Sequence, residues 1–406
     1  MDSRRIIVVG GGAAGFFAAI TCAESAPGAD VTVLEKSPRF LAKVLISGGG
    51  RCNVAPACFD PRALAARYPR GERSLLAAFH KFQARDTVEW FEARGVKLKT
   101  EPDGRMFPVT DSAQTIIDCL LDAARAAGVK LRTHCGVESV KRNGDQFELA
   151  LGGETLVCDR LLLAMGGCRT AAVGQLAAAL GHTLVEPVSS LFTFHIKTPW
   201  LRALPGVSLE SAALSVPGAG LAERGALLVT HWGLSGPVVL RLSAWGARKL
   251  HALDYRFPLL VNWLPEFSPE QLTAEFLVRR ETAGARLVVN VPIAPLSARL
   301  WEALVQAAGI GRETRWSAFN RAQQHALIQQ LTRTEFSVTG KSLNKDEFVT
   351  CGGVKLGEVD FKTMESRVCP GLYFAGELLD IDGLTGGFNF QAAWTTGWLA
   401  GKAMAK

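Results

Sequence analysis

The sequence has few of the features that mark secreted, metal-binding or membrane proteins. Its nine cysteines are an odd number and no two are spaced as C-x-x-C, which argues against a disulfide framework, a zinc site and a thioredoxin-type dithiol. No stretch is long and apolar enough to span a bilayer, and no cluster of Lys and Arg with interleaved aromatics marks a nucleic-acid surface. We therefore expect a cytoplasmic protein with no metal, and neither a membrane nor a nucleic acid as partner.

The first residues resemble a secretion signal, because Arg4 and Arg5 precede an apolar run that ends near Ala26. Glycines from Gly10 to Gly12 interrupt that run, and the apolar pattern continues into another strand. We therefore interpret the segment as the start of a folded domain.

The remaining composition describes a large globular protein. The 406 residues suggest two or three domains, and a hydrophobic content of 48% can fill their cores. The net charge of +7 favours anionic ligands weakly, and we interpret it mostly as solvated surface.

The chain opens with a strand–helix–strand pattern. Residues 6–9 form an apolar run typical of a buried strand, residues 13–26 are helix-like and rich in small side chains, and residues 31–34 form a second strand-like run. This order predicts an α/β fold with a parallel sheet and helices on its faces. A helix from about residue 112 and a strand at residues 161–165 continue the same architecture.

The pattern changes in the middle of the chain. Short strand-like pieces alternate with Pro and Gly turns in residues 191–264, and residues 265–335 are largely helical. The α/β pattern then returns. We therefore predict that residues 1–190 and 341–406 build one domain from both chain ends. Residues 191–340 are predicted to form an inserted substrate domain, part β-barrel-like and part helical.

A glycine-rich turn joins the first strand to the first helix. Gly10, Gly12 and Gly15 satisfy G-x-G-x-x-G, the fingerprint of a dinucleotide-binding turn. The first glycine makes the turn, the second lets a pyrophosphate approach the backbone, and the third allows close helix packing. Glu35 ends the second strand, 20 residues after Gly15, where a carboxylate accepts hydrogen bonds from a ribose. The alternative, a plain glycine-rich turn, becomes the minority interpretation in this context.

A second glycine-rich segment runs from Ser47 to Asn53. Its three consecutive glycines imply a close approach of the backbone to something flat or phosphorylated. Arg51, with Lys43 nearby in the sequence, is suited to pair with phosphate. The alternative is a flexible surface loop, which the apolar residues around the glycines disfavour.

A third segment lies near the C-terminus. Gly376 and Glu377 follow a strand, and a carboxylate there can hold the ribityl chain of a flavin. Gly386 to Asn389 then open the last helix, whose free amides can face the electron-rich edge of an isoalloxazine ring. An ordinary glycine-rich loop explains this segment equally well when it is considered by itself.

Several of these segments resemble one protein family. Gly48 to Asn53 is similar to the G-G-G-R-C-N signature of the BaiN/RdsA-type (YhiN-like) family of NAD(P)/FAD-dependent oxidoreductases. Further blocks agree in order over nearly the whole chain. They are residues 104–108, 230–237, 350–354, 363–366, 371–377 and 380–391.

The resemblance implies a Rossmann-type FAD-binding domain of the glutathione-reductase-like kind and predicts which residues contact FAD. There are two departures from the family, since Ala55 and Pro56 replace a Thr-Asn pair and Phe388 stands where Tyr is common. The predicted contacts are Gly10, Gly12, Ala13, Ala14, Gly15, Glu35, Lys36, Lys43, Ser47, Gly48, Gly49, Gly50, Arg51, Cys52, Asn53, Met165, Gly166, Gly376, Glu377, Gly387, Phe388 and Asn389.

Two residues are candidates for catalysis, and each has a structural alternative that we favour. His231 lies in the predicted insert and is of a type that can protonate a substrate. Cys52 is a candidate reactive thiol without a partner at C-x-x-C spacing. No nicotinamide site is evident, because Gly218 and Gly220 are followed by Glu223 where a third glycine is needed. We therefore expect NAD(P)H to dock transiently near the flavin ring.

These observations predict an FAD-dependent oxidoreductase that acts on a small organic substrate. The protein orients the substrate, flavin N5 transfers a hydride, and NAD(P)H is the expected donor. The resemblance implies reduction of an activated C=C bond, which we favour. The alternatives are an amine-oxidase-like enzyme, an RNA-modifying flavoprotein with a basic stripe on its insert, and a flavin-based redox sensor without turnover.

Overall fold

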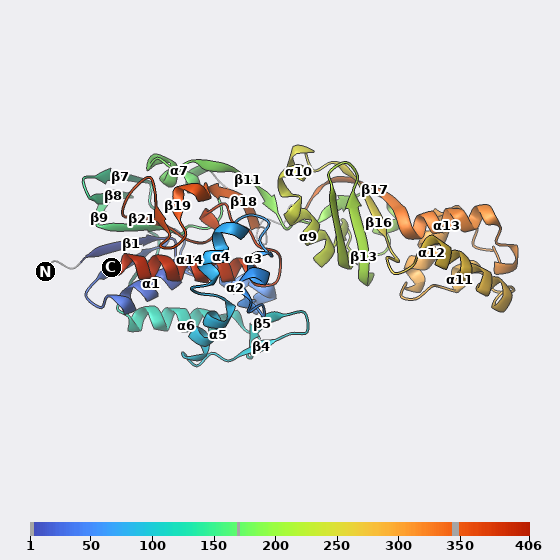
Figure 1. Ribbon diagram of the computed structural model, residues 1–406, viewed down its shortest axis with the longest axis horizontal. Helices are drawn as coiled ribbons and strands as arrows, with labels where there is room; N and C mark the ends of the chain where they lie inside the picture. The colour runs from blue at the N-terminus through green and yellow to red at the C-terminus, as the bar shows by residue number, and fades with distance from the viewer. Residues whose placement is uncertain (1–3, 169–170, 343–348) are drawn as a thin grey trace. The chain divides into compact units, whose positions relative to one another are not determined.

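The chain divides into two compact units. The structure, a computed structural model, describes residues 4–168, 171–342 and 349–406 (Figure 1). Met1–Val188 and Val349–Lys406 form the terminal unit, and Ser189–Phe348 forms the central unit. In the part of the chain that the structure describes, no helix combines the length and apolar character needed to cross a membrane.

The terminal unit is built on one sheet that joins both ends of the chain (Figure 1). In sheet order its seven strands are β19 (Val359–Asp360), β20 (Glu365–Ser366), β21 (Leu372–Phe374), β10 (Arg160–Leu163), β1 (Arg5–Val9), β2 (Asp30–Leu34) and β6 (Lys130–Arg132). The strands from β21 to β6 are parallel, and β19 and β20 are antiparallel. Nearly all side chains of β1, β10 and β21 are buried, as expected for parallel strands covered by helices. The predicted Rossmann-type α/β fold is confirmed.

Two helices from opposite ends of the chain pack closely in the terminal unit. They are α1 (Ala13–Ser25) and α14 (Phe388–Met404). Glycines permit this approach, since a Cβ on Gly397 would lie 2.6 Å from Ala14 O, and one on Gly401 would lie 2.5 Å from Ala18 O. The pairing brings the C-terminal segment to the first turn of α1.

Smaller elements complete the terminal unit. Strands β7 to β9 form an antiparallel sheet, β3, β5 and β4 form another, and β11 pairs with β18. These other strands and α-helices are β3 (Ala55–Pro56), β4 (Leu98–Thr100), β5 (Arg105–Pro108), β7 (Ser139–Asn143), β8 (Gln146–Leu151), β9 (Glu154–Cys158), β11 (Leu184–Ser190), β18 (Val349–Val354), α2 (Ala42–Gly50), α3 (Pro61–Ala65), α4 (Glu72–Phe79), α5 (Ala84–Glu92), α6 (Ala113–Ala126) and α7 (Ala171–Ala179).

The central unit contains a closed barrel. In barrel order its six strands are β12 (Phe194–Ile196), β15 (Gly233–Ser235), β14 (Leu221–Val229), β13 (Ser208–Val216), β16 (Phe257–Asn262) and β17 (Thr334–Lys341). Buried and more exposed side chains alternate along β16, as expected where one face of a strand lines a core. Three helices accompany the strands: α8 (Pro199–Arg202), α9 (Pro237–Trp245) and α10 (Ala247–Ala252). The barrel confirms the expected barrel-like insert.

Three further helices form the helical part of the central unit. They are α11 (Pro269–Thr282), α12 (Ala298–Ala307) and α13 (Arg321–Arg333). A side chain caps each N-terminus, because Ser268, Ser297 and Asn320 accept hydrogen bonds from first-turn amides. Apolar side chains of these helices and of the barrel belong to one continuous core.

Candidate functional site

The glycine-rich turn between β1 and α1 leaves space where a phosphate is expected. A Cβ on Gly10 would lie 2.4 Å from Ala164 O and 2.9 Å from the Cα of Met165, and one on Gly15 would lie 2.0 Å from Gly10 O. By contrast, a Cβ on Gly12 would meet no heavy atom within 4 Å. α1 also begins without a side-chain cap and without an acidic residue in its first turn. The turn therefore leaves amides of the first helical turn open to an anionic group.

Glu35 lies just after β2, beside this turn. Its Oε2 accepts a hydrogen bond from Gly11 N at 2.8 Å, and its Oε1 accepts one from Ser37 N at 2.8 Å. These bonds hold the carboxylate in place, while its oxygens retain lone pairs for further donors such as ribose hydroxyls. The neighbouring Lys36 lies along Gly136, where a Cβ would be 3.2 Å from Lys36 Cγ.

The second glycine-rich segment forms an irregular turn at the end of α2. Gly48, Gly49 and Gly50 have φ values of 57°, 68° and 82°, in the left-handed region that favours glycine. A Cβ on Gly48 would press on Asn53 and Phe107, whereas one on Gly49 would meet nothing within 4 Å. Gly49 therefore presents bare backbone with room for a ligand beside it.

Arg51 is held by carboxylates in this structure. Its Nη1 lies 2.7 Å from Glu101 Oε1 and 3.6 Å from Asp111 Oδ1, and its guanidinium lies over the Phe107 ring, 4.0 Å from the centroid. The hydrogen bond with Glu101 is the main cause that raises the pKa of Arg51. The positive charge is thus balanced locally, and a contact between Arg51 and FAD stays a prediction.

Cys52 has the environment of a structural cysteine. Its side chain is fully buried and hydrogen-bonded to Ser47, and burial raises the pKa of the thiol to about 12. A nucleophilic cysteine needs a shift in the opposite direction. The adjacent Asn53 is also buried, and its Oδ1 accepts a hydrogen bond from Met106 N at 3.3 Å. This setting supports the structural interpretation of Cys52 over the catalytic one.

Predicted contact residues from three distant segments meet beside α1. Lys43 Nζ lies 2.5 Å from Glu377 Oε2. A Cβ on Gly166 would lie 3.5 Å from that ammonium group and 3.9 Å from that carboxylate. Gly376 has a φ of 71°, and a Cβ there would lie 2.9 Å from the Cβ of Ala14. The three segments therefore lie close together, and their role as one FAD site stays a prediction.

The start of α14 lies against the second glycine-rich segment. Gly387 has a φ of 91°, and a Cβ there would lie 2.9 Å from Asn53 Oδ1. The Asn389 side chain holds the preceding loop, since it accepts from Gly383 N at 2.8 Å and donates to Gly383 O at 3.0 Å. α14 has no side-chain cap. Amides at its start therefore remain available to a ligand, while the loop before them is fixed.

Three residues that the sequence did not indicate support this region. Tyr68 is buried, and its hydroxyl donates to Phe388 O at 2.6 Å. The fully buried Asp382 forms an ion pair with Arg70. The partners in these two pairs are 320 and 312 residues apart, so no local pattern connects them. The position of Asp382 within the family-like block 380–391 was the one available signal.

The residues of this region fit an FAD molecule. Open backbone at Gly12 and Gly49 and the uncapped starts of α1 and α14 offer amide donors for phosphate oxygens and for the polar edge of a flavin. Glu35 and Glu377 offer acceptors for ribose and ribityl hydroxyls. All of these groups belong to the terminal unit, although they come from both ends of the chain.

His231 lies in the central unit, in the turn between β14 and β15. Its side chain is exposed, and its backbone carbonyl accepts a hydrogen bond from Arg202 Nε at 3.1 Å. The structural interpretation of His231 required an imidazole that is packed in the core, and the exposed side chain does not meet this requirement. Across residues 4–168, 171–342 and 349–406, no three His, Cys, Asp or Glu side chains are placed to hold a metal ion.

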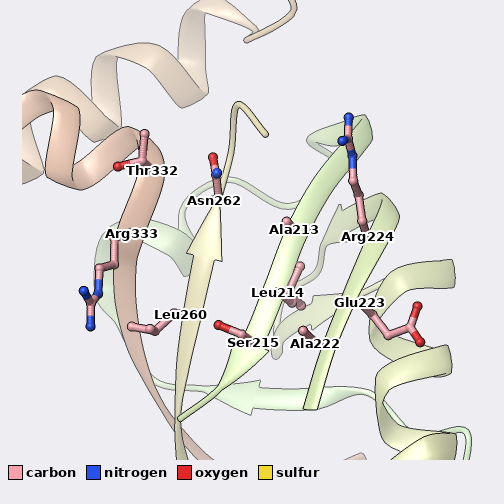
Figure 2. Close-up of a pocket in the computed structure, with 10 residues that line it drawn as sticks. All are labelled: Ala213, Leu214, Ser215, Ala222, Glu223, Arg224, Leu260, Asn262, Thr332 and Arg333. Atoms are coloured by element: carbon pink, nitrogen blue, oxygen red, sulfur yellow. The ribbon is translucent and has the colours of Figure 1, made fainter. Parts of the chain in front are cut away.

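A cavity of about 690 Å³ lies on the barrel of the central unit (Figure 2). Small side chains occupy its middle, and Arg224 and Arg333 lie on opposite sides of it in the figure. Arg224 forms an ion pair with Glu266. No predicted site residue lines this cavity. The lining residues are Ala213, Leu214, Ser215, Ala222, Glu223, Arg224, Leu260, Asn262, Thr332 and Arg333.

Comparison with known proteins gives matches that span the whole chain. The family model described as HI0933-like protein Rossmann domain matches residues 4–403. The 3-dehydro-bile acid delta(4,6)-reductase of Clostridium scindens is 31% identical over 99% of both chains. The ribosomal RNA dihydrouridine synthase of Escherichia coli is 32% identical over 98% of this chain and 97% of its own.

Solved structures show the same architecture at lower identity. The 3-ketosteroid delta1-dehydrogenase from Sterolibacterium denitrificans aligns with a TM-score of 0.53 over 100% of both chains, at 14% identity. A likeness at that identity concerns the fold alone.

Proposed function

This chain belongs to the HI0933-like family of Rossmann-type, FAD-dependent oxidoreductases, and from that membership we propose that it reduces a C=C bond conjugated with a carbonyl group in a small organic substrate. The proposal rests on similarity over nearly the full length of the chain to two proteins whose names describe reduction reactions.

The two names describe one kind of chemistry. A delta(4,6)-reductase of a 3-dehydro bile acid saturates double bonds that are conjugated with a ring carbonyl, and a dihydrouridine synthase saturates the C=C bond of a uracil ring beside its carbonyl. In both reactions two electrons arrive as a hydride at the carbon far from the carbonyl, and a proton adds at the carbon beside it. The proposed substrate therefore contains a planar C=C–C=O group.

The terminal unit supplies the groups that hold FAD in this proposal. The start of α1 beside Gly12 binds the diphosphate, and Glu35 accepts hydrogen bonds from the ribose. Glu377, paired with Lys43, accepts bonds from the ribityl chain, and the start of α14 provides amides for the ring edge. FAD, when bound, supplies the hydride chemistry, and NADH or NADPH is the proposed electron donor.

The central unit holds the substrate in this proposal. Its candidate proton donor is His231, whose exposed side chain lies on the turn between β14 and β15. An imidazole is a common general acid and can donate a proton to the carbon beside the carbonyl. The protein's part of the reaction is therefore to orient the conjugated group and to place this proton.

Uridine in RNA is the second candidate substrate, because of the name of the Escherichia coli relative. The central unit has seventeen basic and twelve acidic residues, an excess that permits contact with phosphate. Several of the arginines are already paired with carboxylates. These pairs are Arg224–Glu266, Arg241–Glu223, Arg279–Glu275 and Arg312–Glu302. This local neutralisation is the reason that we favour a small molecule.

The experiment that tests the function uses the purified holoprotein. A bound-flavin absorbance spectrum is expected, and anaerobic NADH or NADPH should bleach it. Addition of a 3-oxo-4-ene steroid should then restore the oxidised spectrum with formation of the saturated ketone, whereas a uridine-containing RNA should not. Reoxidation by the RNA alone would make the second candidate correct, and reoxidation by neither would reject the proposed reaction.

A pair of variants tests the cofactor site. Lys43→Met removes the partner of Glu377, and we expect FAD affinity to fall about tenfold, which corresponds to ~1.4 kcal/mol. Lys130→Met is the matched control, because Lys130 forms a similar exposed ion pair with Asp30 at the edge of the same sheet. Equal FAD affinity in the two variants would remove Lys43 from the site.

A further inference from the structure

Trp232 is the most exposed tryptophan among the large apolar side chains at the surface. Its side chain is 60% exposed, whereas Trp263, Trp301, Trp316 and Trp394 are fully buried. Single exposed apolar side chains are common on protein surfaces, but tryptophan is enriched among the residues that dominate binding surfaces. The position of Trp232 therefore calls for a physical explanation.

The backbone that carries this ring is fixed from both sides. Thr230 Oγ1 accepts hydrogen bonds from Trp232 N at 3.3 Å and from Gly233 N at 3.2 Å. Trp232 O accepts one from Ile196 N at 2.9 Å, and the neighbouring His231 O accepts one from Arg202 Nε. The ring is thus presented to solvent on a turn that has little freedom to withdraw it.

Gly233 limits the turn further. It has a φ of 150°, and a Cβ there would lie 2.4 Å from Phe194 O and 2.6 Å from Ile196 N. The turn therefore lies directly on β12, and only glycine permits this approach. A fixed backbone at this turn reduces the conformational entropy that is lost when the side chain binds a flat partner, which is the physical advantage of preorganisation.

The turn is hydrogen-bonded to α8, which carries a cation and a second aromatic side chain. Arg202 belongs to α8, and the same helix contributes Trp200 to a groove of about 450 Å³ that it forms with α12. Arg299, Arg312 and Glu302 line this groove as well, and Arg312 is paired with Glu302. A flat ring with polar or anionic substituents matches a surface of this composition better than a purely apolar ligand does.

We propose that Trp232 is a specificity-determining residue that stacks on the planar conjugated ring of the substrate, with Arg202 as the neighbouring cation. The inference rests on the proposed function, because the C=C–C=O group is what makes the substrate ring flat. Trp232 acts in binding, and the chemistry of the reaction does not depend on it.

The test compares Trp232→Ala, Trp232→Phe and Trp245→Ala as FAD-loaded enzymes. Trp245 is the matched control, because it is also exposed, at 41%, on the central unit. With the substrate found above, Trp232→Ala should raise KM about tenfold with little change in kcat, the size expected for loss of one aromatic stacking contact. Trp232→Phe should recover most of the affinity, and Trp245→Ala should match the parent protein.

Two further readouts separate the possible outcomes. FAD absorbance and the rate of flavin reduction by NAD(P)H should be the same in all variants, and calorimetric titration of the oxidised enzyme with the enone should show the same tenfold loss in Trp232→Ala. If the parent enzyme turns over the substrate and Trp232→Ala has the same KM, the stacking role is rejected and the proposed function is not. A change of oligomeric state in Trp232→Ala, with unchanged KM, identifies a contact between copies instead. Parent enzyme that neither binds nor reduces any enone or RNA rejects both proposals.

Discussion

The two helices beside the cofactor site and the three helices in the helical part of the central unit begin in different ways. α1 and α14 follow Gly12 and Gly387 and have no side-chain cap. α11, α12 and α13 follow Ser268, Ser297 and Asn320, whose side chains bind first-turn amides. A side-chain cap stabilises a helix by about 1 kcal/mol. Side chains therefore satisfy part of the first turn of α11, α12 and α13, whereas α1 and α14 leave amides that a ligand can satisfy.

This difference is not a general property of the terminal unit. α6 belongs to the same unit and is capped by Ser112, and α5 has a capping box between Gln83 and Asp86. Uncapped glycine starts also occur at α4, after Gly71, and at α9, after Gly236, so such a start permits a ligand contact without marking one by itself. The comparison predicts that the stability of the terminal unit depends on FAD more than that of the central unit.

Removal of FAD should have the largest effect. At free FAD of 100 times its Kd, binding stabilises the unit that contains the site by about 2.7 kcal/mol. Amide hydrogen exchange should therefore slow in α1 and α14 of the holoprotein and stay the same in α11 to α13. Equal protection of both groups of helices by FAD would contradict the comparison.

Substitutions of two glycines should separate binding from folding. Gly12→Ala places a Cβ in open space, so the apoprotein should keep its stability while FAD affinity falls at least tenfold, about 1.4 kcal/mol. Gly15→Ala forces a Cβ against Gly10 O and should destabilise the apoprotein itself by about 1–3 kcal/mol. Thermal unfolding and FAD titration measure the two effects.

Gly357→Ala is the control for Gly12→Ala, since a Cβ there also meets nothing within 4 Å and the residue is not a predicted FAD contact. If Gly12→Ala binds FAD as tightly as Gly357→Ala, the open space beside α1 is not the diphosphate site.

Loss of a cap in the central unit should have a smaller effect that is independent of FAD. Ser268→Ala removes the acceptor for Gln271 N at the start of α11 and should cost about 1 kcal/mol. FAD affinity should not change. Thr273→Ala on the same helix is the control, because that hydroxyl bonds only to Pro269 O among the contacts described and caps nothing. A loss of FAD affinity in Ser268→Ala would show that the helical part is coupled to the cofactor site.

The smallest expected effect concerns the decrease of protein stability at acidic pH. His182 is buried in the terminal unit, 2.7 Å from Ser366 Oγ, and burial lowers the pKa of its imidazole. The unfolded chain then binds a proton more readily than the folded one. The free energy of unfolding is therefore highest above about pH 6.5 and decreases as the pH falls toward the pKa of His182 in the folded state. His182→Gln should flatten this dependence in denaturant unfolding between pH 7 and 5.

His195 in the central unit allows a matched comparison. Its pKa is also lowered, mainly by burial and additionally by Arg202, but its side chain is only partly buried. We expect His195→Gln to flatten the pH dependence less than His182→Gln. The reverse order would mean that burial is not the dominant cause.

Local patterns in the sequence were sufficient to predict the first β-α-β segment of the terminal unit. The strand, glycine turn and helix that begin the chain, and Glu35 after the next strand, depend on residues that are close in sequence. The apolar runs and the spacing of the glycines are enough to predict them. The family resemblance then indicated Lys43, Gly166 and Glu377 as parts of one site. Their proximity in the terminal unit agrees with that prediction without testing the contacts to FAD.

The sequence by itself thus determined the Rossmann-type fold, the change to a barrel in the middle of the chain and the glycines that need to be bare. Only the tertiary structure decided that Arg51 is engaged by Glu101, that Tyr68 holds Phe388 and that Arg70 neutralises the buried Asp382. It also decided that the side chain of Trp232 is exposed to solvent. Periodicity and turn preferences report on neighbours along the chain, whereas these contacts join segments that meet only when the sheet and barrel have formed.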